Sequence, residues 1–250
     1  MTLPLFLVDP ERVAGAREGS QVVLDGDEGR HAATVRRIAP GEQVLLADGA
    51  GVRLTCDVLT AGKGELGLRV VEVTTVPEPD PRFVLVQALA KGERDDQAVE
   101  AATEYGVDEV VPWQAARSIV QWRGERGEKA RRKWESAVLA ASKQSRRARI
   151  PVVGELATTK SLVARIAGSA AAYVLHEDAT HNLAAQPLPA HGEVLVVVGP
   201  EGGITPEEVA ALEAAGAVAV RLGDTVLRSS SAGPAGLAVL SAAGRWRRAT

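Results

Sequence analysis

The stretch VLVVVGPEGGITPEEV, from Val194 to Val209, decides the fold class. Its apolar run Val194–Val198 predicts a strand that is buried on both faces, as strands of parallel sheets are. A helix is expected from Pro206, because Thr205 suits the N-cap position and Glu208 falls where a capping box places its carboxylate. The glycine-rich segment between strand and helix therefore lies at the carboxyl end of a strand, where open α/β sheets bind ligands.

We call the segment Gly199–Gly203 the glycine loop; its sequence, GPEGG, admits two interpretations. A glycine-rich loop before a helix can bind phosphate through free N–H groups and the helix dipole. Against this, Glu201 would repel a phosphate, Pro200 has no N–H group, and neither a Walker ending nor G-x-G-x-x-G spacing is present. A tight turn with a positive φ at Gly202 or Gly203 explains the same composition. On this stretch alone, the turn is favoured.

Composition indicates a globular protein without a membrane partner. The chain has 250 residues, of which 46% are hydrophobic, enough for one large domain or two smaller ones. No apolar run reaches the length of a membrane helix, and Met1–Pro10 lacks the layout of a signal peptide, so a cytoplasmic location is expected. The single cysteine, Cys56, excludes an internal disulfide framework. The pair His176 and His181 lacks zinc-ligand spacing, and we predict no metal.

Positive charge is concentrated between Arg123 and Arg149, although the formal net charge of the chain is −3. The basic residues there are Arg123, Arg126, Lys129, Arg131, Arg132, Lys133, Lys143, Arg146, Arg147 and Arg149, against the acidic Glu125, Glu128 and Glu135. Such an excess is typical of a surface that binds a polyanion, since each neutralised phosphate releases counterions. A solvated helix face would give the same pattern. Trp122 and Trp134 favour nucleic acid, because they offer stacking surfaces.

The amino-terminal part reads as β-rich. Apolar segments separated by Gly/Asp turns predict a small barrel or sandwich: Leu5–Val8, Gln21–Leu24, Gln43–Ala47, Arg53–Leu59 and Leu66–Val73. One short helix is expected at His31–Ile38. The proline-rich segment TVPEPDPR, from Thr75 to Arg82, suits neither a helix nor a central strand. We therefore predict two domains, 1–75 and 82–250.

The second domain alternates strands and helices, which predicts an α/β fold with a mostly parallel sheet covered on both faces. The expected strands are Phe83–Ala88, Glu109–Pro112, Pro151–Val153, Ala171–His176, Val194–Val198 and Ala219–Arg221. The expected helices are Asp95–Tyr105, Glu128–Arg146, Thr159–Ala167, Pro206–Ala215 and Ala232–Arg245.

A second candidate loop lies in RLGDTVLRSSSAGPAGLAVL, from Arg221 to Leu240. A strand ends before Gly223, and Arg228 precedes three serines and an apolar helix. The serines can cap that helix. Arg228 should lie near the ligand-binding edge of the sheet, where a guanidinium can pair with a phosphate or polarise a base. This loop and the glycine loop are expected to line one pocket.

The motifs VGPEGG, TPEEV and LG…VLRSSSA together resemble the carboxyl-terminal signature of the SPOUT methyltransferases. More narrowly, the chain resembles the RsmE family, which methylates N3 of uridine 1498 in 16S ribosomal RNA of the small subunit. HAATVRRIAPGE, KGERDDQAVEAATEYGVDEVVPWQAARS and AASKQSRRARIP resemble further family segments in the same order. The resemblance covers nearly the whole chain.

The resemblance implies a small PUA-like β-barrel domain, followed by an α/β catalytic domain with a trefoil knot in its parallel sheet, and a homodimer. It implies S-adenosylmethionine as cofactor, a sulfonium without phosphates that is compatible with Glu201. The cofactor-binding residues would be Gly199, Pro200, Glu201, Gly202, Gly203, Leu222, Gly223 and Leu227. The catalytic residues would be Arg228, Ser229 and Ser231. Those binding RNA would be His31, Arg36, Arg37, Arg117, Gln144, Arg146, Arg147 and Arg149.

The chain departs from the family pattern at a few positions. Ser230 stands where the family commonly has glutamate, Ala101 where a lysine is frequent, and Tyr105 where leucine is usual. Three other functions stay open: an inactive ribosome-binding assembly factor, a SPOUT methyltransferase with another RNA target, and an enzyme that binds a phosphate ligand at GPEGG. Loss of S-adenosylmethionine binding would favour the first. The modified atom would decide the second, and nucleotide binding that survives competition by S-adenosylhomocysteine would favour the third.

Overall fold

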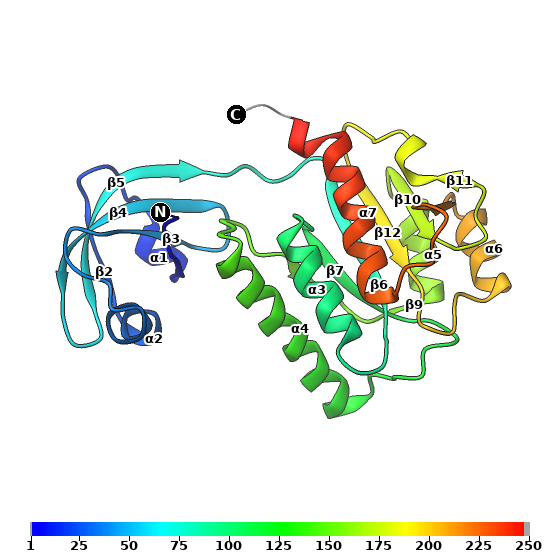
Figure 1. The fold of residues 1–250 in the computed structure, drawn as a ribbon, viewed down its shortest axis with the longest axis horizontal. Coiled ribbons are helices and arrows are strands. Elements are labelled where there is room, and N and C mark those ends of the chain that lie inside the picture. Colours follow the sequence, from blue (N-terminus) through cyan, green and yellow to red (C-terminus); the bar gives the residue numbers. More distant parts are fainter. Residues whose placement is uncertain (1, 248–250) are drawn as a thin grey trace. The chain divides into compact units, whose positions relative to one another are not determined.

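The computed structural model describes residues 2–247 of the chain, which fall into two compact units (Figure 1). The first unit runs to Glu78 and also takes in Ser142–Ile150. The second comprises Pro79–Ala141 and the chain from Pro151 onward. Among residues 2–247, no helix combines the length and the apolar character needed to cross a membrane.

The first unit is built on a five-stranded sheet in the order β1-β3-β4-β5-β2. Its strands are β1 (Leu5–Leu7), β2 (Gln21–Leu24), β3 (Gln43–Ala47), β4 (Val52–Ala61) and β5 (Leu66–Thr75), which confirms all the strands predicted there. Only β1 and β3 pair in parallel. Two register shifts between β4 and β5 let the sheet curl. Its core is closed by Phe6, Val44, Leu54 and Leu68, with the short helix α1 (Pro10–Val13) against it.

The predicted helix at His31–Ile38 was wrong in its bounds. Helix α2 (Gly26–Arg30) begins within the segment DGDEG, and a π-helical turn η1 (His31–Val35) continues it. Asp27 and Glu28 in the first turn favour a helix start there, because carboxylates complement the positive end of the helix dipole. Glycine is required at Gly29, where a Cβ atom would lie 2.5 Å from the carbonyl oxygen of Gly64.

The segment Ser142–Ile150 is held in the first unit by backbone hydrogen bonds. The N–H of Ile150 donates to the carbonyl of Gly49 at 2.9 Å, and the N–H of Gly51 donates to Ala148 at 3.1 Å. Arg149 donates through Nε to the carbonyl of Val76 at 2.9 Å. These contacts attach a late piece of sequence to the β4 and β5 region of the first unit.

The second unit has a sheet in the order β11-β13-β10-β12-β6-β7-β8, with the two-residue strand β9 also paired to β7. The strands are β6 (Arg82–Ala88), β7 (Glu109–Gln114), β8 (Val152–Val153), β9 (Ala157–Thr158), β10 (Ala171–Leu175), β11 (His181–Asn182), β12 (Glu193–Val198) and β13 (Val218–Arg221). Every strand pairing in this sheet is parallel. The predicted α/β class with a mostly parallel sheet is confirmed.

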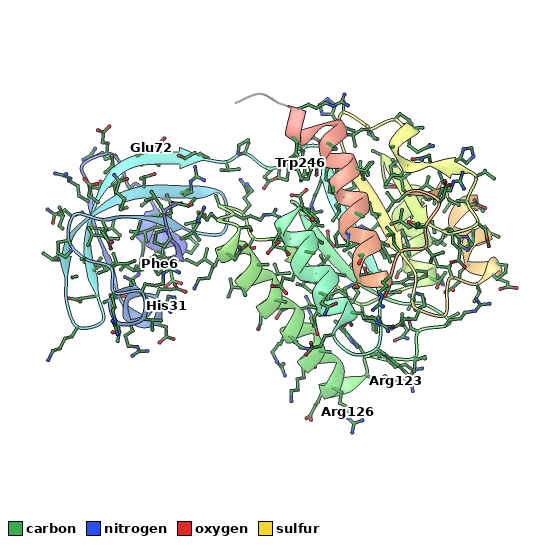
Figure 2. The ribbon with its side chains drawn as sticks, viewed as in Figure 1. Phe6, His31, Glu72, Arg123, Arg126 and Trp246 are labelled. Atoms are coloured by element: carbon green, nitrogen blue, oxygen red, sulfur yellow. The ribbon has the colours of Figure 1, made fainter. Side chains whose placement is uncertain are left out.

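Helices cover both faces of this sheet (Figure 1). On one face, α5 (Thr159–Ala167) and α6 (Pro206–Ala214) pack on a core that includes Val84, Leu195 and Val197. On the other, α7 (Ser229–Ala243) packs on β6, since a Cβ on Gly233 would lie 2.7 Å from Leu85 Cδ1. Helix α3 (Arg94–Glu104) lies against α7. Beyond α7, Trp246, which is labelled in Figure 2, meets Tyr105 edge to face at 6.4 Å between ring centroids.

Helix α4 (Gly124–Gln144) begins earlier than predicted and corrects the expectation about its tryptophans. Trp134 is 1% exposed and contacts Trp122 edge to face at 5.1 Å between ring centroids. A buried indole has no free face for a nucleobase, so the stacking prediction for Trp134 was wrong. Several basic side chains on this helix also form ion pairs. Arg131 pairs with Glu135 and Glu155, and Lys133 pairs with Asp96. By contrast, Arg123 and Arg126 project outward near its start (Figure 2).

Glu208 on α6 completes the predicted capping box with Thr205 and also makes hydrogen bonds outside its own helix, which the sequence did not predict. Its Oε1 accepts from the N–H of Ala116 at 2.9 Å and from Thr159 Oγ1 at 2.8 Å. Because Glu208 is 7% exposed, these donors have no water to replace it. The carboxylate therefore joins α6 to the loop after β7 and to the start of α5.

Glu208→Ala is expected to lower the free energy of unfolding by about 3 kcal/mol, since it removes a cap and leaves two donors unpaired. Urea unfolding measures this change. Glu207→Ala is the matched control, because Glu207 lies in the same helical turn but is exposed. Equal shifts in the two variants would show that the buried contacts of Glu208 add nothing.

Candidate functional site

The site lies at the carboxyl edge of the parallel sheet in the second unit. Strands β13, β10, β12 and β6 are neighbours, so the segments that follow them meet at one edge. A cavity of about 1020 Å³ opens there. Its walls come mainly from the segments after β10, β12 and β13, together with the first turns of α6 and α7. A cavity of this size at a strand-end crevice is the default place for a small-molecule ligand.

The glycine loop adopts the tight turn that the sequence favours. Gly203 has a φ of +74°, and its N–H donates to the carbonyl of Pro200 at 2.9 Å. Gly199 must also be small, because a Cβ atom there would lie 2.6 Å from Ile204 Cγ1. The turn directs the loop backbone along the cavity wall, and all five residues of the loop line the cavity.

Glu201 anchors the glycine loop to the segment after β6. Its Oε1 accepts from the N–H of Lys91 at 3.0 Å and from Arg94 Nη1 at 2.8 Å. Burial raises the pKa of Glu201, but hydrogen bonds from its own N–H, from Lys91 and from Arg94 outweigh burial and hold that pKa below its ordinary value. An engaged carboxylate with a lowered pKa is a weak general base. The geometry therefore favours the structural role of Glu201 over proton transfer.

Arg117 holds the glycine loop from the side of β7. Its Nη1 donates to the carbonyl of Gly202 at 2.9 Å, and the side chain lines the cavity. A Cβ atom on Gly202 would come within 3.3 Å of Arg117 Cβ, so the glycine allows the close approach. Arg117 was predicted to bind RNA, and in the structure it lies beside the glycine loop, which was predicted to bind the cofactor.

Two of the three predicted catalytic residues line the cavity. Arg228 is the N-cap residue of α7, is exposed, and has no described hydrogen bond or ion pair from its side chain among residues 2–247. Ser229 Oγ is buried and finds no hydrogen-bond partner in the described chain. Ser231 lies in the same helical turn, but its residue is not part of the cavity lining. The predicted helix start at Ala232 was wrong, because Arg228 takes the N-cap position and the serines form the first turn.

The predicted cofactor residues all line this one cavity. All eight line the cavity: Gly199, Pro200, Glu201, Gly202, Gly203, Leu222, Gly223 and Leu227. The orphaned hydroxyl of Ser229 indicates that a polar ligand group belongs beside it, since buried polar atoms are normally paired. The wall also carries more carboxylates than the glycine loop alone supplies, namely Glu177, Asp178, Glu213 and Asp224. The same wall carries Arg94, Arg117, Arg221 and Arg228, so groups of both charges line the cavity.

His176 is a cavity residue that the sequence reasoning missed. It follows β10 directly, and its N–H donates to the carbonyl of Val220 at 2.9 Å. Its Nδ1 accepts from the N–H of Asp178 at 3.2 Å, which orients the ring. The signal was available, because His176 ends a predicted strand just as the glycine loop does. In the described part of the chain, no three His, Cys, Asp or Glu side chains are grouped for a metal ion.

The remaining predicted RNA-binding residues all lie in the first unit. Gln144, Arg146, Arg147 and Arg149 belong to Ser142–Ile150, while His31, Arg36 and Arg37 follow α2. His31 packs edge to face on Phe6 at 6.2 Å between ring centroids, yet its residue stays exposed (Figure 2). Arg37 and Arg146 both have positive φ, at 53° and 58°. Such strain in non-glycine residues concentrates at functional positions.

Comparisons with known proteins agree along the whole chain. A family described as RNA methyltransferase domain matches residues 77–241, and one described as RNA methyltransferase PUA domain matches residues 24–71. Ribosomal RNA small subunit methyltransferase E of Mycobacterium tuberculosis is 48% identical over 251 residues, covering 98% of this chain and 94% of the relative. The Bacillus subtilis protein of the same name is 27% identical, covering 84% and 85%.

Two solved structures share the fold over nearly their full length. The Neisseria gonorrhoeae ribosomal RNA small subunit methyltransferase E, bound to S-adenosyl methionine, has a TM-score of 0.82 at 25% identity, covering 97% of this chain and 98% of that one. A Legionella pneumophila methyltransferase in complex with the same cofactor has a TM-score of 0.82 at 26% identity and the same coverage.

Proposed function

Because the chain belongs to the ribosomal RNA small subunit methyltransferase E family, we propose that it methylates N3 of uridine 1498 in 16S ribosomal RNA. The observation that carries this proposal is the cavity, which all eight predicted cofactor residues line together with Arg228. At the coarser level, the chain is an S-adenosylmethionine-dependent ribosomal RNA methyltransferase. The methylated atom, N3, and the modified nucleotide, uridine 1498, are what we propose beyond this.

The cofactor, when bound, supplies an electrophilic methyl group on a positively charged sulfur. The glycine loop would hold it through backbone groups, since Gly199, Gly202 and Gly203 let the main chain approach closely. Leu222 and Leu227 provide apolar wall on the opposite loop. The buried hydroxyl of Ser229 would pair with a polar group of cofactor or base.

Methylation at N3 requires that the imide proton leave, so negative charge develops on the uracil oxygens. We assign Arg228 to stabilise this charge, because its guanidinium lies at the cavity wall and has no partner among the described residues 2–247. Ser229 would donate a hydrogen bond, and Ser231 remains a proposed partner from the same turn. Holding N3 in line with the methyl group supplies much of the rate. The target base must leave its stack to enter the cavity.

The architecture implied by the family extends the proposal. The chain would form a trefoil knot near its carboxyl end and act as a homodimer in the cytoplasm, with domains 1–75 and 82–250, the second of which contributes Ser142–Ile150 to the first compact unit. Strand β12 lies between β10 and β6, so neighbouring strands in this region do not follow their order along the chain, as a knotted path requires. The PUA match supports an RNA-binding role for the first unit.

The decisive test is transfer of labelled methyl from S-adenosylmethionine to small ribosomal subunits that lack the modification, followed by identification of the product nucleoside. We expect label in N3-methyluridine at position 1498. Label in another nucleoside would replace this target with a different one. Tight subunit binding without methyl transfer would instead indicate an inactive assembly factor.

The basic residues near Ile150 are expected to bind RNA phosphates. Replacing Arg146 and Arg147 together with alanine should weaken subunit binding and reduce the slope of log affinity against log salt by about two. Lys160→Ala on α5 is the control, because Lys160 is exposed in the other unit. An unchanged slope in the double variant would mean that these arginines are only solvated surface charges.

A further inference from the structure

Arg94 stands where its charge is unfavourable for the helix that carries it. It is the first residue of α3, and a cation at the amino end of a helix opposes the helix dipole. Its side chain is 45% exposed, lines the cavity, and has Glu201 as its only described partner in residues 2–247. A cation kept at a helix start beside a ligand cavity indicates a role other than stabilising the helix.

The contact with Glu201 leaves most of the guanidinium available. Only Nη1 is engaged, at 2.8 Å, while an arginine carries five N–H donors in a planar fork. Half-exposed ion pairs of this kind contribute little to stability. Arg94 can therefore keep its bond to Glu201 and still offer Nε and Nη2 to a second anion, in the geometry that suits phosphate.

A phosphate is the anion that this edge of the cavity would meet. This step rests on the proposed function: a nucleotide whose base enters the cavity leaves its phosphates at the mouth. Arg94 and Arg117 both line the wall and both contact the glycine loop, Arg94 through Glu201 and Arg117 through Gly202. Glu201 is further fixed by the N–H of Lys91.

We infer that the guanidinium of Arg94 is shared between Glu201 of the glycine loop and a phosphate of the RNA substrate, so that cofactor binding and RNA binding are coupled through this pair. Glu201 is a positioning residue that aims Arg94. A cofactor bound against the glycine loop would restrict Glu201 further, and a restricted Glu201 holds Arg94 ready for the phosphate. Coupling is reciprocal, so RNA must strengthen cofactor binding by the same factor.

The test measures binding of unmodified small ribosomal subunits with and without saturating S-adenosylhomocysteine. For the wild type, we expect the cofactor product to raise subunit affinity about fivefold. Arg94→Ala should lower subunit affinity about tenfold, reduce the salt slope by about one, and abolish the coupling. Arg94→Lys should restore the salt slope but not the coupling, because an ammonium lacks the planar fork.

Glu201→Gln separates positioning from charge. It should abolish most of the coupling and raise subunit affinity without S-adenosylhomocysteine, since it removes a negative charge beside the proposed phosphate position. Arg247→Ala, beyond the far end of α7, is the control arginine. Wild-type affinity and salt slope in Arg94→Ala, or unchanged coupling in both Arg94→Ala and Glu201→Gln, would overturn the inference.

Failure of the proposed function would look different. A wild-type chain that binds no S-adenosylhomocysteine in calorimetry, or methylates no ribosomal RNA, would remove the proposed function itself. A wild type that binds both ligands, together with an Arg94→Ala variant that matches it, removes only the role of Arg94.

Discussion

Arg228→Ala is expected to lower kcat for methyl transfer to unmodified small subunits by about 10²–10³-fold, the typical cost of removing one charge-stabilising donor from an active site. Arg228 lines the cavity, and its side chain has no described partner in residues 2–247, so its positive charge is available to the uracil oxygens. The dissociation constant for S-adenosylhomocysteine should change less than about threefold, because the interaction forms mainly in the transition state.

Arg221→Ala provides the matched control for this effect. Arg221 also lines the cavity but pairs with Asp224 at 3.5 Å, so its loss should affect the rate far less. Arg228→Lys should recover part of the rate, since it keeps the charge without the planar fork. Single-turnover rates with subunits would measure all three variants. A rate within tenfold of the wild type in Arg228→Ala would place the anion-stabilising group elsewhere.

Glu109→Gln should lower the free energy of unfolding by about 3 kcal/mol, because it removes the buried carboxylate at the centre of a charge network. Glu109 is 9% exposed and binds Arg165 through both carboxylate oxygens, at 2.8 and 2.7 Å. It also accepts from Arg82 at 2.7 Å, and Glu193 bridges the same two arginines. The network joins the first residues of β6, β7 and β12, opposite the cavity, so catalysis should change less than stability.

The pH dependence of this effect follows from the direction of the pKa shift. Burial raises the pKa of Glu109, but Arg165 and Arg82 outweigh burial and lower that pKa below its ordinary value of 4.5. A lowered folded-state pKa means that the stabilisation is complete above pH 4.5 and is lost as the pH falls through the folded-state value. The stability difference between wild type and Glu109→Gln should therefore shrink in acid.

Chemical denaturation at several pH values would measure this difference. Glu135→Gln serves as control, because its pair with Arg131 is half exposed and should be worth about 0.5 kcal/mol or less. A constant difference between wild type and Glu109→Gln from neutral pH into acid would contradict the assigned charge network.

Local patterns predicted the elements of the fold well where a single signal dominated. The apolar run of β12 and the capping box at Thr205 fixed strand, loop and helix within a residue. Two-residue strands such as β9 and β11 carry too little pattern to be found. The early start of α2 was missed because DGDEG reads as a turn, while its carboxylates also favour a helix start.

The site was predictable wherever a loop follows a strand with a recognisable signature. The glycine loop and the segment from Leu222 to Leu227 meet at one cavity as expected. Arg94 carries no local signature, and only the strand order brings it to that cavity, whereas His176 could have been found because it ends a predicted strand. The charge network around Glu109 could not be predicted from the sequence either, because its members are separated by up to 111 residues along the chain and meet only in the folded sheet.

Because the first unit includes Ser142–Ile150, its folding depends on chain that is synthesised long after Glu78. A fragment that stops at Glu78 would leave the backbone of Gly49, Gly51 and Val76 without the partners that Ser142–Ile150 supplies. During synthesis, the amino-terminal unit is completed only after Ile150 has emerged from the ribosome. Exchanging this unit with that of a relative consequently requires two separate transplanted segments, and no single proteolytic cut yields both units intact.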